Sequence, residues 1–176
     1  IESALSGVKK AVRPDQTLWY RRTFTVPDKL RDQRLLLHFG AVDWECTVYV
    51  NGVYCGRHQG GYDPFYFDIT GALTAGGDQE LIVAAWDPSD TGYQPRGKQI
   101  LEPQGIWYTA VTGIWQTVWL EPVPRACIRD LAMTPDIDKG VLRLTAATDG
   151  AAPGDEVVAV AFDGDTRIVG AVGAPG

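Results

Sequence analysis

The stretch Trp44–Cys55, WECTVYVNGVYC, decides the fold class of this chain. Its apolar residues alternate, so that Trp44, Cys46, Val48 and Val50 share one face of a strand and the residues between them share the other. The Asn-Gly dipeptide that follows is the strongest short-range hairpin signal, because both turn positions favour positive φ. The stretch therefore predicts two antiparallel strands joined by a tight turn.

Segments of strand length continue on both sides of this hairpin. We predict further strands at Trp19–Val26, Leu35–Phe39, Phe65–Ile69, Leu81–Trp86, Thr117–Leu120, Val141–Ala147, Val157–Phe162 and Arg167–Val172. Trp115 and Trp119 are expected to fill the core. Helical periodicity is weak, with one possible turn at Ser3–Lys10. Short strands with Gly and Pro between them favour an all-β sandwich over a βαβ fold.

The aromatic residues indicate a domain boundary. All six Trp and all seven Tyr lie between Trp19 and Trp119, whereas the C-terminal stretch is rich in Ala, Val, Gly and Asp. The change coincides with Pro122-Val123-Pro124, a stiff, linker-like sequence. We therefore expect one domain over residues 1–122 and a second over residues 123–176.

Composition excludes several classes of protein. A net charge of −6 argues against a nucleic-acid binder, and no apolar run approaches the roughly 18–20 residues of a membrane helix. The three cysteines cannot all pair within the chain. Cys46 is expected to be a small buried residue, and its pairing with Cys55 is the less favoured alternative. An unpaired thiol slightly favours the cytoplasm over secretion, although the compartment stays open. No metal-ligand spacing and no cofactor motif is present.

The sequence lacks a convincing catalytic set. It contains no GxSxG elbow, P-loop or GxGxxG motif. Asp43 and Glu45 are two residues apart and are expected to lie together on the solvated side of a strand. Asp87 and Asp90 flank a turn, where Asp typically caps backbone groups. His38, inside an apolar strand, is expected to be hydrogen-bonded rather than catalytic.

A long connection and a nearby aromatic segment are the best candidates for a binding role. The connection over residues 87–104 is rich in Pro and Gly, and long loops of this kind are usually functional or disordered. Sugar sites commonly combine flat aromatic rings with planar hydrogen-bonding groups. The candidate substrate-binding residues are Arg96, Lys98, Gln99, Trp107 and Tyr108.

A set of motifs in fixed order resembles a known family. The motifs are LWYRRTF at residues 18–24, FGAVD at 39–43, VNG at 50–52, GGYDPF at 60–65, QPRGKQ at 94–99 and GIWYTAVTGIWQTVWLE at 105–121. Together they resemble the N-terminal sugar-binding domain of glycoside hydrolase family 2, which includes β-galactosidases, β-glucuronidases and β-mannosidases. The resemblance covers about residues 1–122.

This resemblance implies a jelly-roll, galactose-binding-like β-sandwich followed by an immunoglobulin-like sandwich and a (β/α)₈ barrel that carries both catalytic glutamates. Residues 123–176 are too few for the roughly 100 of a complete immunoglobulin-like domain and would form only its first part. The barrel needs roughly 250 residues and would lie outside this chain. The resemblance thus predicts a non-catalytic N-terminal piece of a retaining hydrolase of β-glycosides, inactive alone, whose partners are a carbohydrate and its own barrel.

In relatives a jelly-roll loop reaches the mouth of the barrel, which is the role expected for the five candidate residues. Some relatives hold a cation near the segment before the Gly113-Ile114 pair, but Trp107 and Tyr108 stand there in this chain, so no metal site is expected. Two alternatives stay open, an independent carbohydrate-binding module and a structural spacer. A homo-oligomer is also possible, and the sequence does not indicate which sugar is bound.

Overall fold

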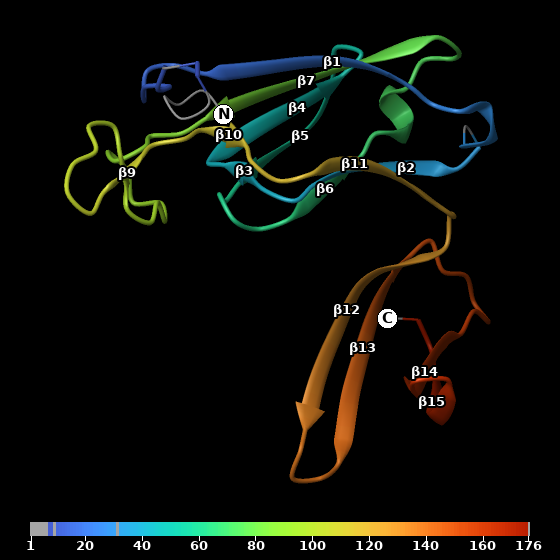
Figure 1. The fold of residues 1–176 in the computed structure, drawn as a ribbon. Coiled ribbons are helices and arrows are strands. Elements are labelled where there is room, and N and C mark those ends of the chain that lie inside the picture. The colour runs from blue at the N-terminus through green and yellow to red at the C-terminus, as the bar shows by residue number, and fades with distance from the viewer. Residues whose placement is uncertain (1–6, 9, 31, 176) are drawn as a thin grey trace. The chain divides into compact units, whose positions relative to one another are not determined.

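The computed structural model describes residues 7–8, 10–30 and 32–175. They divide into two compact units, Ile1–Pro122 and Val123–Gly176 (Figure 1). Strands dominate both units, so the chain is all-β, as predicted. The helical turn expected over Ser3–Lys10 falls largely on residues outside the described part. No helix among the described residues is long and apolar enough to cross a membrane.

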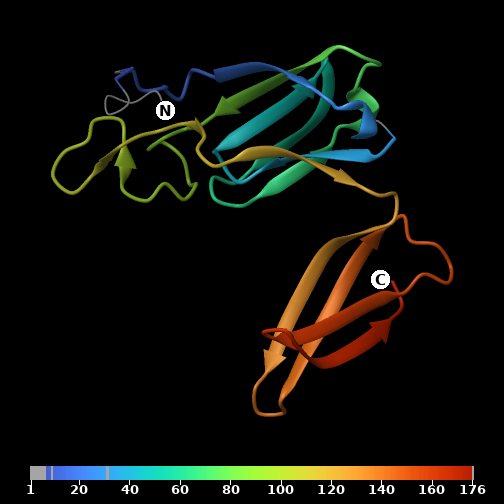
Figure 2. The same cartoon turned by 45° about the vertical axis from the view of Figure 1, so that its right-hand side comes forward.

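The two larger sheets of the first unit form two layers (Figure 1 and Figure 2). The larger sheet has four antiparallel strands in the order β1 (Leu18–Thr25), β7 (Asp78–Trp86), β4 (Glu45–Val50) and β5 (Val53–Gln59). The smaller sheet has the order β11 (Val118–Val123), β2 (Arg34–Phe39) and β6 (Phe65–Asp68). β1 and β11 are edge strands of the two sheets, and residues of both line an opening between the layers.

Short elements close the ends of this sandwich. β3 (Val42–Asp43) pairs with β10 (Gly113–Ile114), and β8 (Gln99–Ile100) pairs in parallel with β9 (Tyr108–Thr109). Two 3₁₀ turns, η2 (Asp28–Leu30) and η3 (Thr70–Ala72), lie beside the strands they connect. The loop that runs from the end of β7 to β10 is therefore partly ordered by strand pairing.

The core lies between the two sheets and follows the predicted alternation. Cys46, Val48 and Val50 of β4 are almost fully buried, and Leu35 and Phe39 of β2 face them from the other sheet. Burying such side chains contributes roughly 1.5–3 kcal/mol each. Burial also raises the pKa of the Cys46 thiol to about 12, as expected for a cysteine that serves as a small apolar residue. No disulfide joins Cys46, Cys55 or Cys127, all of which lie in the described part of the chain.

The Asn51-Gly52 turn joins β4 to β5 as predicted, with φ of 51° and 77° at its two positions. The returning strand is longer than the expected Val53–Cys55 segment, because its pairing with β4 continues to Gln59. His58 on this strand is stacked on Phe65, with ring centroids 3.9 Å apart, and is partly buried.

The second unit consists of two hairpins. β12 (Cys127–Asp136) pairs with β13 (Val141–Asp149), and β14 (Val157–Asp163) pairs with β15 (Thr166–Gly173). Three of these strands were predicted, whereas β12 was missed. Its sequence, CIRDLAMTPD, mixes charged residues, Ala and Pro, and a register shift after Ile128 breaks its alternation.

Each hairpin of the second unit has an apolar face that is largely exposed. Leu131 and Met133 of β12 lie opposite Ala146 and Leu144 of β13 and are 43% and 60% exposed. Val158 and Phe162 of β14 are each 61% exposed. Among the described residues of this unit only Val123 is buried. The second unit therefore has far less of a core than the first.

Candidate functional site

The loop from β7 to β10 is anchored by a buried carboxylate. Asp87 follows β7 directly, and its side chain accepts a hydrogen bond from the Ser89 amide at 2.8 Å and from the Thr112 hydroxyl at 3.3 Å. Gln94 donates through Nε2 to the Ser89 carbonyl at 2.7 Å and to Asp87 at 3.5 Å. Asp87 thus ties the beginning, the middle and the end of the loop together, which confirms that it caps backbone groups.

Asp90 holds the same loop through two further hydrogen bonds. Its carboxylate accepts the Leu101 amide at 3.2 Å, and its carbonyl accepts a hydrogen bond from Arg96 at 2.6 Å. These contacts fix the path of the chain from the tip of the loop back toward β8. The connection that the sequence left without structure is therefore held by a network of side-chain contacts.

The prediction that Asp43 lies on the solvated side with Glu45 is wrong. The two residues belong to different strands, since β3 ends at Asp43 and β4 begins at Glu45 after a cis peptide between Asp43 and Trp44. Glu45 is held by Arg57 and by Gln59, whose Nε2 lies 2.7 Å away, and the Arg57 hydrogen bond lowers its pKa. Asp43 is only 7% exposed and packs against Gly61.

Burial gives Asp43 unusual acid-base behaviour. Loss of hydration, with a smaller contribution from the negative charge of Asp87, raises the pKa of Asp43 from 3.8 to about 7. Its Oδ1 atom has no hydrogen-bond partner within the described part of the chain. We interpret Asp43 and Asp87 as buried residues beneath the loop rather than as a carboxyl pair that a substrate reaches.

The pairing of β8 with β9 brings four of the five candidate binding residues together. Gln99 lies opposite Tyr108, and the Tyr108 amide donates to the Lys98 carbonyl at 2.7 Å. Trp107 precedes Tyr108 directly. Because β8 and β9 are parallel neighbours, the backbones of these residues lie in one small part of the loop.

The candidates differ in how free their side chains are. Arg96 donates to the Asp90 carbonyl, and Gln99 Oε1 accepts the Val111 amide at 2.9 Å, so both help to hold the loop. Lys98 is exposed, and Trp107 and Tyr108 are 41% and 64% exposed. These three side chains are therefore the ones placed to meet a ligand.

Two tryptophans expected in the core lie at the surface instead. Trp115 is 46% exposed, donates through Nε1 to the Gly61 carbonyl at 2.7 Å, and meets the ring of Tyr62 edge-on. Trp119 is 43% exposed because it lies on the outer face of β11. Strand alternation places Val118 and Leu120 inward, and this signal could have placed Trp119 correctly from the sequence.

Trp119 forms part of a polar and aromatic cluster on the smaller sheet. Its ring stacks on His38, with centroids 4.8 Å apart, and His38 Nε2 lies 2.8 Å from a carboxylate oxygen of Glu121. The two atoms are close, but His38 Nε2 makes no contact of hydrogen-bond geometry within the described residues, so the predicted hydrogen bond of His38 is not confirmed. Within the described residues, no three His, Cys, Asp or Glu side chains come together as a metal site.

Comparison with known proteins places the first unit in a family. The pattern described as "Glycosyl hydrolases family 2, sugar binding domain" matches residues 8–124. A β-galactosidase of Thermoanaerobacter pseudethanolicus is 33% identical over 120 residues, which are 67% of this chain and 15% of that protein. A β-galactosidase of Pseudoalteromonas haloplanktis is 32% identical over 155 residues, 85% of this chain and 14% of that protein.

Solved structures agree with this assignment. A β-glucuronidase of Lactobacillus rhamnosus matches with a TM-score of 0.70 and 27% identity, over 91% of this chain and 28% of that one. A β-glucuronidase of an uncultured Clostridium matches with the same TM-score and 28% identity, over 93% of this chain and 29% of that one. The chain spans less than a third of each relative, and it belongs to glycosyl hydrolases family 2.

Proposed function

We propose that this chain is the non-catalytic N-terminal part of a glycoside hydrolase that cleaves β-galactosides or β-glucuronides. The family match to the sugar binding domain supports the proposal, as do the relatives named β-galactosidase and β-glucuronidase. In this proposal the bond is cleaved with retention by two glutamates of a barrel domain outside this chain. Residues 1–176 contribute binding and shape rather than bond cleavage.

The exposed patch on the β7–β10 loop is the observation that carries a role in substrate binding. Trp107 and Tyr108 offer flat faces for stacking on a sugar ring, and Lys98 offers a charge and hydrogen-bond donors. The buried contacts of Asp87 hold the loop in one conformation, so little conformational entropy would be lost when a ligand binds. We propose that these three side chains face the substrate and that Arg96 and Gln99 position them.

Substitution in the complete gene product tests this role. Replacing Tyr108 with Ala, or Trp107 with Ala, is expected to lower kcat/KM about tenfold or more on a β-galactoside or β-glucuronide, because a stacking surface is lost. Tyr93→Ala is the matched control, since Tyr93 lies in the same loop with its side chain fully exposed. Values of kcat/KM that stay equal in all three variants would remove the loop from the substrate site.

Activity and binding measurements on the chain alone distinguish this role from the alternatives. Residues 1–176 are expected to leave chromogenic β-galactosides and β-glucuronides intact, because the proposed catalytic glutamates lie elsewhere. Turnover by the pure chain would contradict the proposal. Tight binding of a free glycan in a calorimetric titration would instead favour an independent carbohydrate-binding module.

A further inference from the structure

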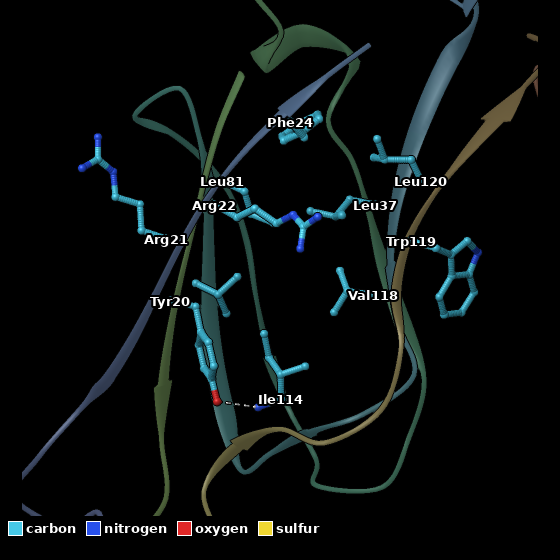
Figure 3. A pocket seen from close by; sticks show the side chains of 11 residues that line it. Tyr20, Arg21, Arg22, Phe24, Leu37, Leu81, Ile114, Val118, Trp119 and Leu120 are labelled. Carbon is cyan, nitrogen blue, oxygen red and sulfur yellow. Dashed lines mark hydrogen bonds between the residues drawn. The ribbon is translucent and has the colours of Figure 1, made fainter. Parts of the chain in front are cut away.

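A hollow opens between the edge strands β1 and β11 of the first unit. Its volume is about 670 Å³, within the range of sites that bind small molecules. The floor reaches Leu37 and Val83, which belong to the buried core. Two arginines also line the hollow, Arg21 and Arg22. The remaining lining residues are apolar or aromatic, which makes the walls largely apolar: Tyr20, Phe24, Leu81, Ile114, Val118, Trp119 and Leu120 (Figure 3).

One charged side chain enters this apolar hollow. Alternation along β1 places Arg22 on the inward face, between Tyr20 and Phe24, where an apolar residue is the usual choice. Figure 3 shows its guanidinium group in the opening, pointing toward Leu37 and Val118. No described carboxylate forms an ion pair with Arg22.

The neighbouring arginine provides a direct contrast. Arg21 lies on the outer face of the same strand and pairs with Glu80 at 2.7 Å. Arg22 has no such partner on its side of the sheet, although a guanidinium group presents a planar fork of donors that matches a carboxylate. The unpaired guanidinium at the mouth and the apolar walls behind it together define the chemistry of an occupant.

We propose that this hollow binds an amphipathic carboxylate, with its apolar body between the sheets and its anionic group on Arg22. Burial of the apolar body would supply most of the binding free energy, and the ion pair would fix the orientation. An uncharged sugar fits less well, because the walls offer few hydrogen-bonding groups. The proposal does not depend on the glycosidase function proposed above.

A titration of the whole chain with octanoate, followed by NMR, tests the proposal. Amide signals of Tyr20, Leu37, Val83 and Ile114 are expected to shift with octanoate and to respond about tenfold more weakly to octanamide, which has the same chain and no charge. Arg22→Met is expected to weaken octanoate binding about tenfold or more. Arg57→Met, on β5 of the same sheet and outside the hollow, is the control and is expected to bind octanoate as the wild type does.

Three results would overturn the proposal. Equal affinity for octanoate and octanamide would show that Arg22 does not bind the anion. Shifts confined to β12–β15 would show that the ligand only coats the exposed apolar strands of the second unit. The third result is an Arg22→Met variant that binds octanoate as before but self-associates more. It would mean that Arg22 protects the edge strand β1 from pairing with another chain, a role that inward-pointing charges have in other sheets. Arg22→Lys, which keeps the charge, is expected to retain part of the affinity and guards against misfolding of the Met variant.

Discussion

Asp43 is a carboxyl group whose burial makes the stability of the first unit depend on pH. Its pKa is about 7 in the folded chain, against 3.8 for an ordinary Asp, so the folded state holds this proton more tightly than the unfolded state does. Stability is therefore highest below about pH 4 with respect to this group, falls as pH rises toward about 7, and is level above that. The shift corresponds to at most about 4 kcal/mol.

Asp43→Asn, which cannot ionise, is expected to remove this loss. Urea unfolding at about pH 5 and about pH 8 measures it: the wild type should lose ~1–3 kcal/mol more than the variant between the two. Burial lowers the pKa of His58, so this residue makes folding more favourable as pH rises. Because its contribution is the same in both proteins, the difference between their pH profiles isolates the effect of Asp43. Parallel pH profiles for the two proteins would show that Asp43 is solvated in the folded chain.

The β4–β5 hairpin shows how one element is fastened to its neighbours. Asn51, in the turn, donates to the Ala72 carbonyl at 2.9 Å and to Gln79 Oε1 at 2.7 Å, and accepts the Glu80 amide at 2.8 Å. Gln79 is fully buried, and its Nε2 in turn donates to the carbonyls of Thr74, Gly76 and Gly77. The turn is thereby joined to η3 and to the start of β7.

Replacing Asn51 with Ala is expected to destabilise the first unit by about 2–4 kcal/mol, since three hydrogen bonds are lost and Ala disfavours the positive φ. Asn51→Gly tolerates that φ but makes none of the bonds, and should recover only about 1 kcal/mol of the loss. Chemical denaturation of the three proteins measures both contributions. Full recovery of stability in the Gly variant would mean that the hydrogen bonds contribute nothing.

At the level of elements, the sequence predicted what local patterns control. Alternation placed β1, β4 and β6, continuous apolar runs placed β2 and β7, and the Asn-Gly dipeptide placed the turn, because all three signals depend on neighbours along the chain. Contacts between distant residues were not predictable in this way. The anchor from Asp87 to Thr112 and the burial of Asp43 against Gly61 arise only when separate segments meet in the fold.

In the candidate site, too, the sequence indicated residues by their type but not the contacts that they make with distant residues. The aromatic and polar composition of the loop indicated Lys98, Trp107 and Tyr108, whereas the structural contacts of Arg96 and Gln99 depend on where Asp90 and Val111 lie. Trp115 was expected in the core because large apolar residues are usually buried, but its Nε1 donates to Gly61 and leaves half of the ring exposed.

Across the whole molecule, the two units differ in how much apolar surface they bury. The first has a core of nearly inaccessible side chains, such as Leu35, Phe39 and Ile69, whereas the strands of the second expose most of their apolar residues. Two-stranded hairpins are only marginally stable in water without a hydrophobic face to cover them. The hydrogen bonds of the second unit should therefore open more often than those of the first.

Hydrogen exchange of the intact chain, read by mass spectrometry, tests this difference. Amides of β12–β15 are expected to exchange at least about tenfold faster than those of β2, β4 and β7, because opening a hairpin uncovers little apolar surface while opening the sandwich uncovers its core. The amides of β1 and β11, at the open edge of the sandwich, serve as an internal comparison and should lie between the two groups. Equal protection of β12–β15 and β4 would mean that the exposed faces of the second unit are covered in solution, for instance by a second copy of the chain, and dilution would then restore fast exchange.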